Sequence, residues 1–378
     1  MKNFLRPYTI LLPIYKEEKI IEQLISAIKD LIYPKNLLQV LCLIESDDNK
    51  TLSALLKINL PDYFSILIVK GEGPKTKVRA CNFGLKYTTG DYLVIFDAED
   101  IPEKGQLLKA AKTFYQSNDP YLSCLQAKLT FYNYNTNTLT RLCTLEYFFH
   151  FNFILPAFSK YEIPIPLGGT SNHLRTSILK RINGWDEYNV TEDADLTYRL
   201  YKNNFKIKML NSYTSEETVV DIKSWIKQRS RWIKGHIITF LVQSRTIFNI
   251  NTKANSIKYV FSLYYFMGIT SILSLFQFYW PILLYFFIYN TPSKVNIYLS
   301  ITNFLLYIYC YLKIPLSLLL SKNKILPKTL IKYCFIFPIY IFLYTLPSLI
   351  AIKQLIFKPY KWEKTNHGNN LYKKTNNN

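Results

Sequence analysis

The sequence DYLVIFDAED, residues 91–100, is a short run of strand-forming apolar residues that stops at three acids. Three earlier apolar, β-prone runs also end in polar loops, at residues 8–12, 38–46 and 65–70. We expect Pro13 to close the first run, an amphipathic helix over residues 20–31, and further helices after the other runs. Strands that alternate with helices predict an α/β fold with a parallel sheet and helices on both faces. Because such sheets bind ligands at the carboxyl ends of their strands, a nucleotide site there is the leading hypothesis.

The side chains at these strand ends suit a nucleotide diphosphate. Asp97 and Glu99 are two positions apart, so both carboxylates can reach one Mg or Mn ion, and that ion can bridge a diphosphate. After the third strand, Lys77 and Arg79 can neutralise phosphates, and Asn82 is expected to hold the start of the next helix. Acids after a strand are also common in solvated turns, so both interpretations stay open on these residues alone. A Walker loop and a GxGxxG fingerprint are absent from the sequence, which argues against an ATPase or a dehydrogenase.

The segment NVTEDADLTYRL, residues 189–200, predicts the start of a helix that carries three clustered acids. Asn189 is the expected helix cap, and the leucines further on continue an apolar stripe. A carboxylate crowded by others resists ionisation, so its pKa rises toward the range in which it accepts a proton. The segment therefore predicts a catalytic base. The alternative is an ordinary capped surface helix with an ion pair between Asp195 and Arg199.

The net charge of +20 belongs almost entirely to the second half of the chain. Residues 1–221 contain 26 Lys and Arg and 25 Asp and Glu, whereas residues 222–378 contain 20 Lys and Arg and one acid, Glu363. The bases of the second half flank long uncharged apolar runs, which is typical of membrane proteins in contact with lipids. The sequence has no zinc-finger spacing, basic zipper region or RNA-binding aromatic signature, so we expect no nucleic-acid partner.

The second half predicts a membrane domain. Residues 222–256 predict interfacial amphipathic helices, with Trp225, Arg229, Trp232 and Lys234 on a basic helix. Three uncharged stretches, the first long enough for a hairpin, predict about four transmembrane helices within residues 257–357: 259–289, 295–312 and 333–352. The basic loop at 321–328 conflicts with four crossings, so three or four stay open. We expect the tail, residues 358–378, to lie in the cytosol.

The first half is expected to lie in the cytosol. The chain begins with a short apolar run that is broken by a proline, so neither a secretory signal nor a spanning helix is predicted there. The six cysteines form no CxxC pair and are predicted to be reduced core residues. Residues 141–158 are aromatic and apolar but contain Glu146, His150 and Asn152. We therefore expect this segment to lie against a membrane face or to line a channel.

Taken in order, these motifs resemble the membrane-integrated family 2 glycosyltransferases, specifically the bacterial branch similar to the catalytic subunits of cellulose synthase and poly-N-acetylglucosamine synthase. The resemblance runs from about Tyr8 to His367. Four elements carry it: the acids of residues 45–48, the Asp97 and Glu99 pair, the TED of residues 191–193, and the QxxRW of residues 228–232. The sequences LGGTSNH and WEKTNHG resemble further blocks of this branch. The resemblance implies a GT-A-like nucleotide-sugar domain over residues 1–221, then the interfacial region and the transmembrane domain.

The resemblance also implies roles for individual residues. Asp193, the last residue of the TED, would be the general base, with Glu192 and Thr191 shaping the site. Asp97 and Glu99 occupy the DxD position, where they would contact the nucleotide diphosphate and its Mg or Mn ion.

Other positions are implied to bind substrate. Glu45 or Asp47 would contact the nucleoside, and Lys77 and Asn82 belong to the same candidate donor site. Three residues would lie beside the acceptor and the diphosphate, with the tryptophan as a stacking platform for a sugar ring: Gln228, Arg231 and Trp232. Four tail residues resemble a segment that folds back over the nucleotide: Trp362, Lys364, Thr365 and His367.

The implied activity is that of an inverting β-glycosyltransferase. It would move a sugar from UDP-glucose or UDP-N-acetylglucosamine to a growing polysaccharide at the inner membrane, with a possible accessory synthase subunit. The acceptor hydroxyl would displace UDP directly, without a covalent enzyme intermediate. Two alternatives remain: a single transfer to a membrane lipid, and an inactive membrane scaffold or transporter component.

Overall fold

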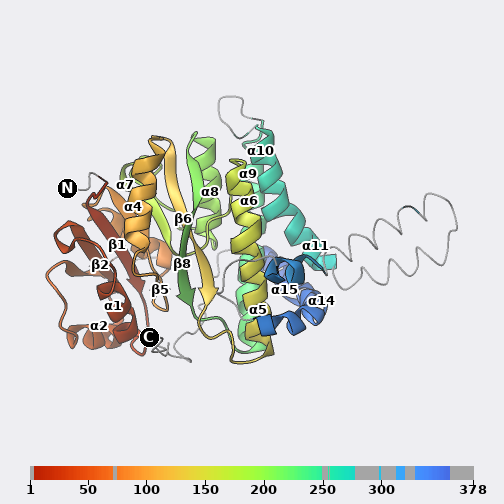
Figure 1. The fold of residues 1–378 in the computed structure, drawn as a ribbon, viewed down its shortest axis with the longest axis horizontal. Coiled ribbons are helices and arrows are strands. Elements are labelled where there is room, and N and C mark those ends of the chain that lie inside the picture. The colour runs from red at the N-terminus through yellow and green to blue at the C-terminus, as the bar shows by residue number, and fades with distance from the viewer. Residues whose placement is uncertain are drawn as a thin grey trace.

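The computed structural model describes residues 4–70, 75–248, 256–276, 312–319 and 328–357, together with residues 254 and 298. At its centre is an eight-stranded sheet with the strand order β3-β2-β1-β4-β7-β6-β8-β5. Helices cover the sheet, and a second group of helices that includes α9, α10, α11, α14 and α15 lies beside it (Figure 1).

The first four strands are parallel neighbours, as the sequence predicts. They are β1 (Tyr8–Ile14), β2 (Leu38–Glu45), β3 (Phe64–Val69) and β4 (Tyr92–Ile95). The helices between them are α1 (Ile21–Lys29), α2 (Asn49–Leu56) and α3 (Lys77–Leu85). The expectation that Pro13 closes the first strand is wrong. Pro13 still pairs in register with Leu43, and β1 ends one residue later.

The other half of the sheet is mixed, which corrects the prediction of a parallel sheet. β7 (Asn172–Arg175) runs antiparallel to both of its neighbours, β4 and β6 (Leu122–Phe131). β8 (Lys206–Glu216) is parallel to β6, and β5 (Ile101–Pro102) is antiparallel to β8. Strands buried on both faces give no alternating pattern from which their direction could be predicted. Three helices belong to this half: α4 (Gln106–Ser117), α7 (Thr176–Arg181) and α8 (Glu192–Lys202).

The aromatic segment after β6 forms one continuous helix, which packs against the sheet domain. Its parts are α5 (Thr138–Phe149), the π-helix η2 (His150–Ile154) and α6 (Leu155–Lys160). Next to it lies α9 (Ile222–Ser244), which the sequence predicts as a membrane-surface helix. Three side chains of that helix are buried inside the protein: Trp225, Arg229 and Lys234. They are buried because α9 packs against α8, η4 and α15.

Among the residues that the structure describes, two helices are long and apolar enough to cross a membrane, judged by length and composition: Ile257–Phe276 and Phe337–Phe357. The first consists of α10 (Ile257–Ser262), η4 (Leu263–Ile269) and α11 (Thr270–Phe276). The second consists of α14 (Phe337–Phe342) and α15 (Thr345–Phe357), preceded by η5 (Lys328–Phe335). Their Ser274 and Ser348 hydroxyls are 2.8 Å apart. Parts of the predicted four-helix domain and the whole tail, with Trp362, Lys364, Thr365 and His367, lie outside the described residues.

The described cysteines are buried and free, which confirms that prediction for Cys42, Cys81, Cys124, Cys143 and Cys334. The sixth, Cys310, lies outside the described residues.

The close packing of α9 against α8 can be tested at one glycine. A methyl group at Gly235 of α9 would collide with the side chain of Thr191, the residue before α8. We expect Gly235→Ala to cost about 1–3 kcal/mol of stability and to lower the melting temperature by several degrees. Gly105→Ala is the control, because a methyl group there meets nothing within 4 Å. Equal melting temperatures for both variants would contradict this packing.

Candidate active site

A cavity of about 670 Å³ begins at the carboxyl ends of β1, β2 and β4, at the edge where the sequence predicts the ligand. Acidic and basic side chains surround this end, among them Glu45, Lys77, Asp97, Glu99 and Asp193. The cavity continues between η2, α9, η4 and α14, where its walls are mostly aromatic and apolar. One space therefore joins a charged end at the sheet to an aromatic end among the helices.

Three charged side chains from different segments face Gly169. A Cβ atom at this glycine would lie 3.6 Å from Lys77 Nζ, 3.7 Å from Asp193 Oδ2 and 4.0 Å from Asp97 Oδ2. Lys77, the first residue of α3, forms an ion pair with Asp97 and donates a hydrogen bond of 2.6 Å to the Gly169 carbonyl. The fold thus brings the strand-end acid and the TED acid to one point of the cavity, as the sequence predicts.

The site also depends on two acids that the sequence analysis does not single out. Asp100 is fully buried, and it accepts hydrogen bonds from the Asp97 backbone N–H, at 2.6 Å, and from the Thr170 hydroxyl. It therefore fixes the turn that carries Asp97 and Glu99. Glu216 is the last residue of β8 and lines the same cavity. The position of Asp100 within the acidic stretch of residues 97–100 is a signal that the sequence offers, whereas no local motif indicates Glu216.

Burial controls the protonation of the acids in this site. It raises the pKa of Asp193 to about 7, with the neighbouring Glu192 charge as the next cause. Burial and the charge of Asp97 raise the pKa of Glu99 to about 8. Burial alone would lower the pKa of Lys77, but Asp97 and Glu192 more than offset this and raise it. The crowding predicted from the sequence is present, but removal from water is the larger effect.

Asp97 and Glu99 both line the cavity. Within the part of the chain that the structure describes, no group of three or more His, Cys, Asp or Glu side chains could hold a metal on its own. Two carboxylates are nevertheless a common protein contribution to a Mg²⁺ site, where substrate phosphates and water supply the other ligands. The two residues therefore fit an ion of the Mg or Mn type that a diphosphate would complete.

Glu45 and Asp47, the two candidates for contact with the nucleoside, differ in burial and in position relative to the cavity. Glu45 is buried, pairs with Arg79 at 3.2 Å and lines the cavity. The Asp47 side chain is 44% exposed and pairs with Lys75 at 2.5 Å. Arg79, expected to neutralise phosphates, is turned toward Glu45. Of the two acids, Glu45 is the one that reaches the cavity.

Asn82 does not hold the start of a helix, which corrects that expectation. α3 already begins at Lys77, with Thr76 as its cap, so Asn82 lies inside the helix. Its amide donates to the Trp185 carbonyl and to Glu187, both at 2.9 Å, and accepts from the Trp185 N–H at 3.0 Å. These hydrogen bonds hold the loop before α8 in place, and Glu187 of that loop lines the cavity.

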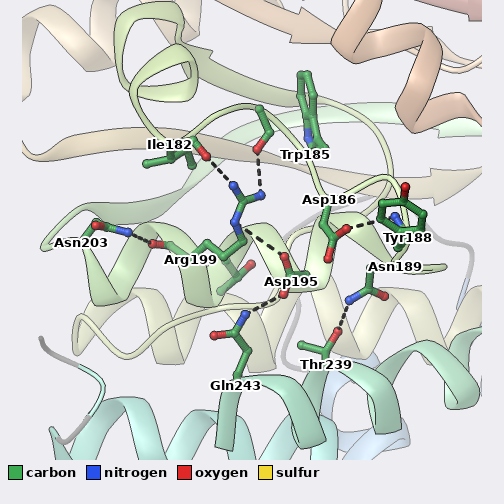
Figure 2. Close-up of polar contacts among 12 residues, drawn as sticks. Ile182, Trp185, Asp186, Tyr188, Asn189, Asp195, Arg199, Asn203, Thr239 and Gln243 are labelled. Atoms are coloured by element: carbon green, nitrogen blue, oxygen red, sulfur yellow. Dashed lines mark hydrogen bonds and ion pairs between the residues drawn. The ribbon is translucent and has the colours of Figure 1, made fainter. Parts of the chain in front are cut away.

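The start of α8 also differs from the prediction. Thr191 is the residue before the helix, and Asn189 does not cap it. The Asn189 side chain instead accepts a hydrogen bond from the Thr191 N–H at 3.0 Å. It also donates one of 2.9 Å to Thr239 of α9 (Figure 2). The segment just before Glu192 and Asp193 is therefore attached to α9.

Asp195 makes a second attachment between the same helices. It is 1% exposed and accepts a hydrogen bond of 2.6 Å from Gln243 of α9. The predicted ion pair with Arg199 is present at 3.9 Å, and Arg199 also donates to the carbonyls of Ile182 and Gly184 (Figure 2). The acidic helix is thus fixed to α9 on one side and to the preceding loop on the other.

The QxxRW residues lie on the face of α9 that borders the cavity. Gln228, Arg231 and Trp232 are spaced so that a helix places them together, and all three line the cavity. Arg231 donates a hydrogen bond of 3.4 Å to the Val190 carbonyl, beside the TED. The Trp232 ring lies 6.3 Å from the ring of Tyr147 on α5.

Comparisons with known proteins relate the chain to glycosyltransferases. A model of the family described as "Glycosyl transferase family group 2" matches residues 92–346. The chain is 26% identical over 264 residues to "Probable glycosyltransferase YdaM" of Bacillus subtilis (strain 168), covering 68% of this chain and 61% of that protein. It is 27% identical over 237 residues to "Probable glucomannan 4-beta-mannosyltransferase 7" of Oryza sativa subsp. japonica, covering 59% of this chain and 39% of that protein. The match thus spans less than two thirds of either relative.

A solved structure supports the predicted fold class. The mannosyltransferase PcManGT from Pyrobaculum calidifontis, in complex with GDP-Man and Mn²⁺, superimposes with a TM-score of 0.52 at 15% identity, covering 91% of this chain and 87% of that one. At this identity the likeness shows the fold alone, a GT-A-like mixed sheet with helices.

The raised pKa values predict that the metal-free protein loses stability as pH rises. The folded protein keeps protons on Glu99 and Asp193, with pKa values of about 8 and 7, that the unfolded chain releases near pH 4. We expect the melting temperature to fall by several degrees between pH 5 and 8, and Glu99→Gln to reduce this slope. The control is Glu103→Gln, since its ion pair with Lys109 is at the surface. Equal slopes for all three proteins would refute the raised pKa of Glu99.

The contact between α8 and α9 gives a second prediction. Gln243→Leu removes a hydrogen-bond donor from the buried Asp195 carboxylate, which should cost about 1–3 kcal/mol of stability. Asn203→Ala, in the same group of contacts, removes one exposed hydrogen bond to the Arg199 carbonyl and should cost at most about 0.5 kcal/mol. Thermal unfolding of both variants measures the difference. A Gln243 variant as stable as the Asn203 variant would be evidence against this attachment.

Proposed function

The chain belongs to the glycosyl transferase family group 2, and from this premise we propose that it is an inverting β-glycosyltransferase that builds a polysaccharide at the inner membrane. The donor is a nucleotide-diphosphate sugar, and the acceptor is the growing glycan. In this proposal residues 1–221 form the cytosolic transferase domain, residues 222–256 join it to the membrane region, and residues 257–357 anchor it.

The observation that carries the proposal is the cavity that joins Asp97, Lys77 and Asp193 to the face of α9 that carries Trp232. A donor needs charged groups for its diphosphate, whereas a sugar acceptor can stack on aromatic rings. The charged end lies at the sheet edge where nucleotides ordinarily bind, and the aromatic end lies beyond Asp193. Both substrates therefore have a suitable surface on either side of one carboxylate.

The residues perform a direct displacement. Asp193 accepts the proton of the acceptor hydroxyl, whose oxygen attacks the anomeric carbon while the bond to the nucleotide diphosphate breaks. Its raised pKa, about 7, suits a base that works near neutral pH. Arg231 and Lys77 stabilise the departing diphosphate by charge. The single displacement inverts the anomeric configuration and needs no enzyme nucleophile.

Donor and metal follow from the site and its relatives. Glu45 contacts the nucleoside, and Asp97 and Glu99 hold a Mg or Mn ion whose charge offsets that of the diphosphate. UDP-glucose and UDP-N-acetylglucosamine are the donors that the sequence resemblance favours. GDP-mannose is a third candidate donor, because PcManGT is in complex with GDP-Man and Mn²⁺ and because the rice relative is named a mannosyltransferase.

The membrane assignment is supported by charge and helices. Two described helices are apolar and long enough to span a bilayer, and nearly all of the excess positive charge lies in this half of the chain. The likeness to cellulose synthase and poly-N-acetylglucosamine synthase subunits would make the enzyme processive, with a possible accessory subunit. Transfer of one sugar to a membrane lipid uses the same site and differs in product length.

We expect membranes that contain the protein to release nucleotide from one of UDP-glucose, UDP-N-acetylglucosamine and GDP-mannose when Mg or Mn is present. EDTA should stop the release. Asp193→Asn should lower the rate at least about a hundredfold, because an amide cannot accept the proton. The matched control is Asp119→Asn, which removes a surface acid paired with Lys206 outside the cavity and should keep wild-type activity.

The outcomes separate the possible functions. Equal release from wild type and Asp193→Asn would disprove the base assignment. Release from none of the donors would favour the inactive scaffold. Where release occurs, chromatography of the labelled product distinguishes a polymer from a lipid that carries one sugar.

A further inference from the structure

The aromatic end of the cavity contains an ion pair between a buried arginine and a half-buried glutamate, to which the transfer reaction gives no role. Arg229 of α9 is 2% exposed, and its guanidinium lies 2.8 Å from Glu146 Oε2 of α5. Glu146 also accepts hydrogen bonds from the hydroxyls of Tyr340, at 2.6 Å, and Tyr344, at 2.5 Å. Both tyrosines belong to the apolar helix Phe337–Phe357. Side chains from three segments thus meet at Glu146, and all four line the cavity.

Arg229 also faces a residue of the QxxRW motif. Its guanidinium carbon lies 4.3 Å from the centre of the Trp232 ring, closer than to the ring of Trp225, at 5.8 Å, or Tyr344, at 5.7 Å. A guanidinium at this distance stacks on an indole and is attracted by its π electrons. Arg229 therefore occupies one side of Trp232 and fixes the plane of its ring.

A purely structural role explains this pair less well. Removing the Arg229 charge from water costs free energy that a hydrophobic side chain at the same place would not cost. The apolar helices here have other contacts, such as the one between Ser274 and Ser348. Ionisable side chains among apolar helices usually face a cavity and serve a function, and Arg229 and Glu146 both border the cavity.

We propose that Arg229 is a positioning residue for Trp232, and that Glu146, Tyr340 and Tyr344 hold Arg229 in place. The proposal rests on the proposed function, in which Trp232 is the platform for the acceptor sugar. Arg229 acts through Trp232 by setting the tilt of the ring. The position in which the helix Phe337–Phe357 packs against α9 therefore affects the transfer step through Arg229 and Trp232.

The test uses the full-length protein in membranes and the donor that gives the fastest nucleotide release. Rates are divided by the number of nucleotide-binding sites, counted with labelled UDP or GDP, so that loss of folded protein does not enter the comparison. Arg229→Lys keeps the charge but lacks the planar guanidinium. We expect kcat to fall about tenfold while the donor KM stays within about twofold, because Trp232 lies on the acceptor side.

Matched controls come from a similar pair outside the cavity. The Arg141 guanidinium lies 5.0 Å from the centre of the Tyr333 ring. Arg141→Lys and Tyr333→Phe should leave kcat and KM unchanged. Tyr344→Phe, which removes one hydroxyl from Glu146, should lower kcat in the same way as Arg229→Lys but less.

A double-mutant cycle then asks whether Arg229 acts through Trp232. In a Trp232→Leu background, Arg229→Lys should cost little further activity, since the ring that Arg229 positions is no longer there. Independent, additive losses would overturn the positioning role, as would a wild-type kcat for Arg229→Lys, and the transferase proposal would survive both results. Absence of donor-dependent release from the wild type would instead overturn the proposed function, and the positioning role would fall with it.

Discussion

The site depends on Lys77, whose charge lies among buried acids. Buried carboxylates are costly unless a cation or a proton neutralises them. Lys77 pairs with Asp97, is attracted by Glu192 and is held by the Gly169 carbonyl. Burial also raises the pKa of Glu99, so that a proton neutralises this carboxylate in the absence of a further cation. A diphosphate would bring more negative charge among these carboxylates, so its binding calls for a further cation. The excess of acids over bases thus gives an electrostatic reason for the proposed metal.

The second constraint is the attachment of α8 to α9. Asn189, Asp195 and the close approach of Gly235 fix the acidic helix against the helix that carries QxxRW. α9 in turn packs against η4 and α15 of the apolar helices. A change in the seating of these helices would therefore move both the candidate base and the acceptor platform. For this reason the helical half is part of the site, even though the charged residues come from the sheet domain.

Local patterns in the sequence predict the first four strands, because an apolar run that ends in polar residues belongs to one element. The position of QxxRW beside the cavity comes instead from the family resemblance. Local patterns could not predict the antiparallel β7, since a strand buried on both faces carries no mark of its direction. Asn82 was misassigned because its partner, Trp185, is about a hundred residues away. The choice between Glu45 and Asp47 requires the burial of each side chain, which two acids separated by one residue at a strand end do not reveal.

Polar contacts between residues far apart in the chain are the features that the sequence predicts least well. Several of them lie at the end of the cavity that is bordered by helices. Glu146 interrupts an aromatic run in the sequence, which argues against a spanning helix and favours a segment that lies on a membrane face or lines a channel. In the fold the same carboxylate meets Arg229 and two tyrosines of an apolar helix. Such groups are retained among apolar helices when their polar ends find partners or face a cavity. The polar interruptions in the apolar segments are therefore the best guide in the sequence to where a hydrophilic substrate could pass.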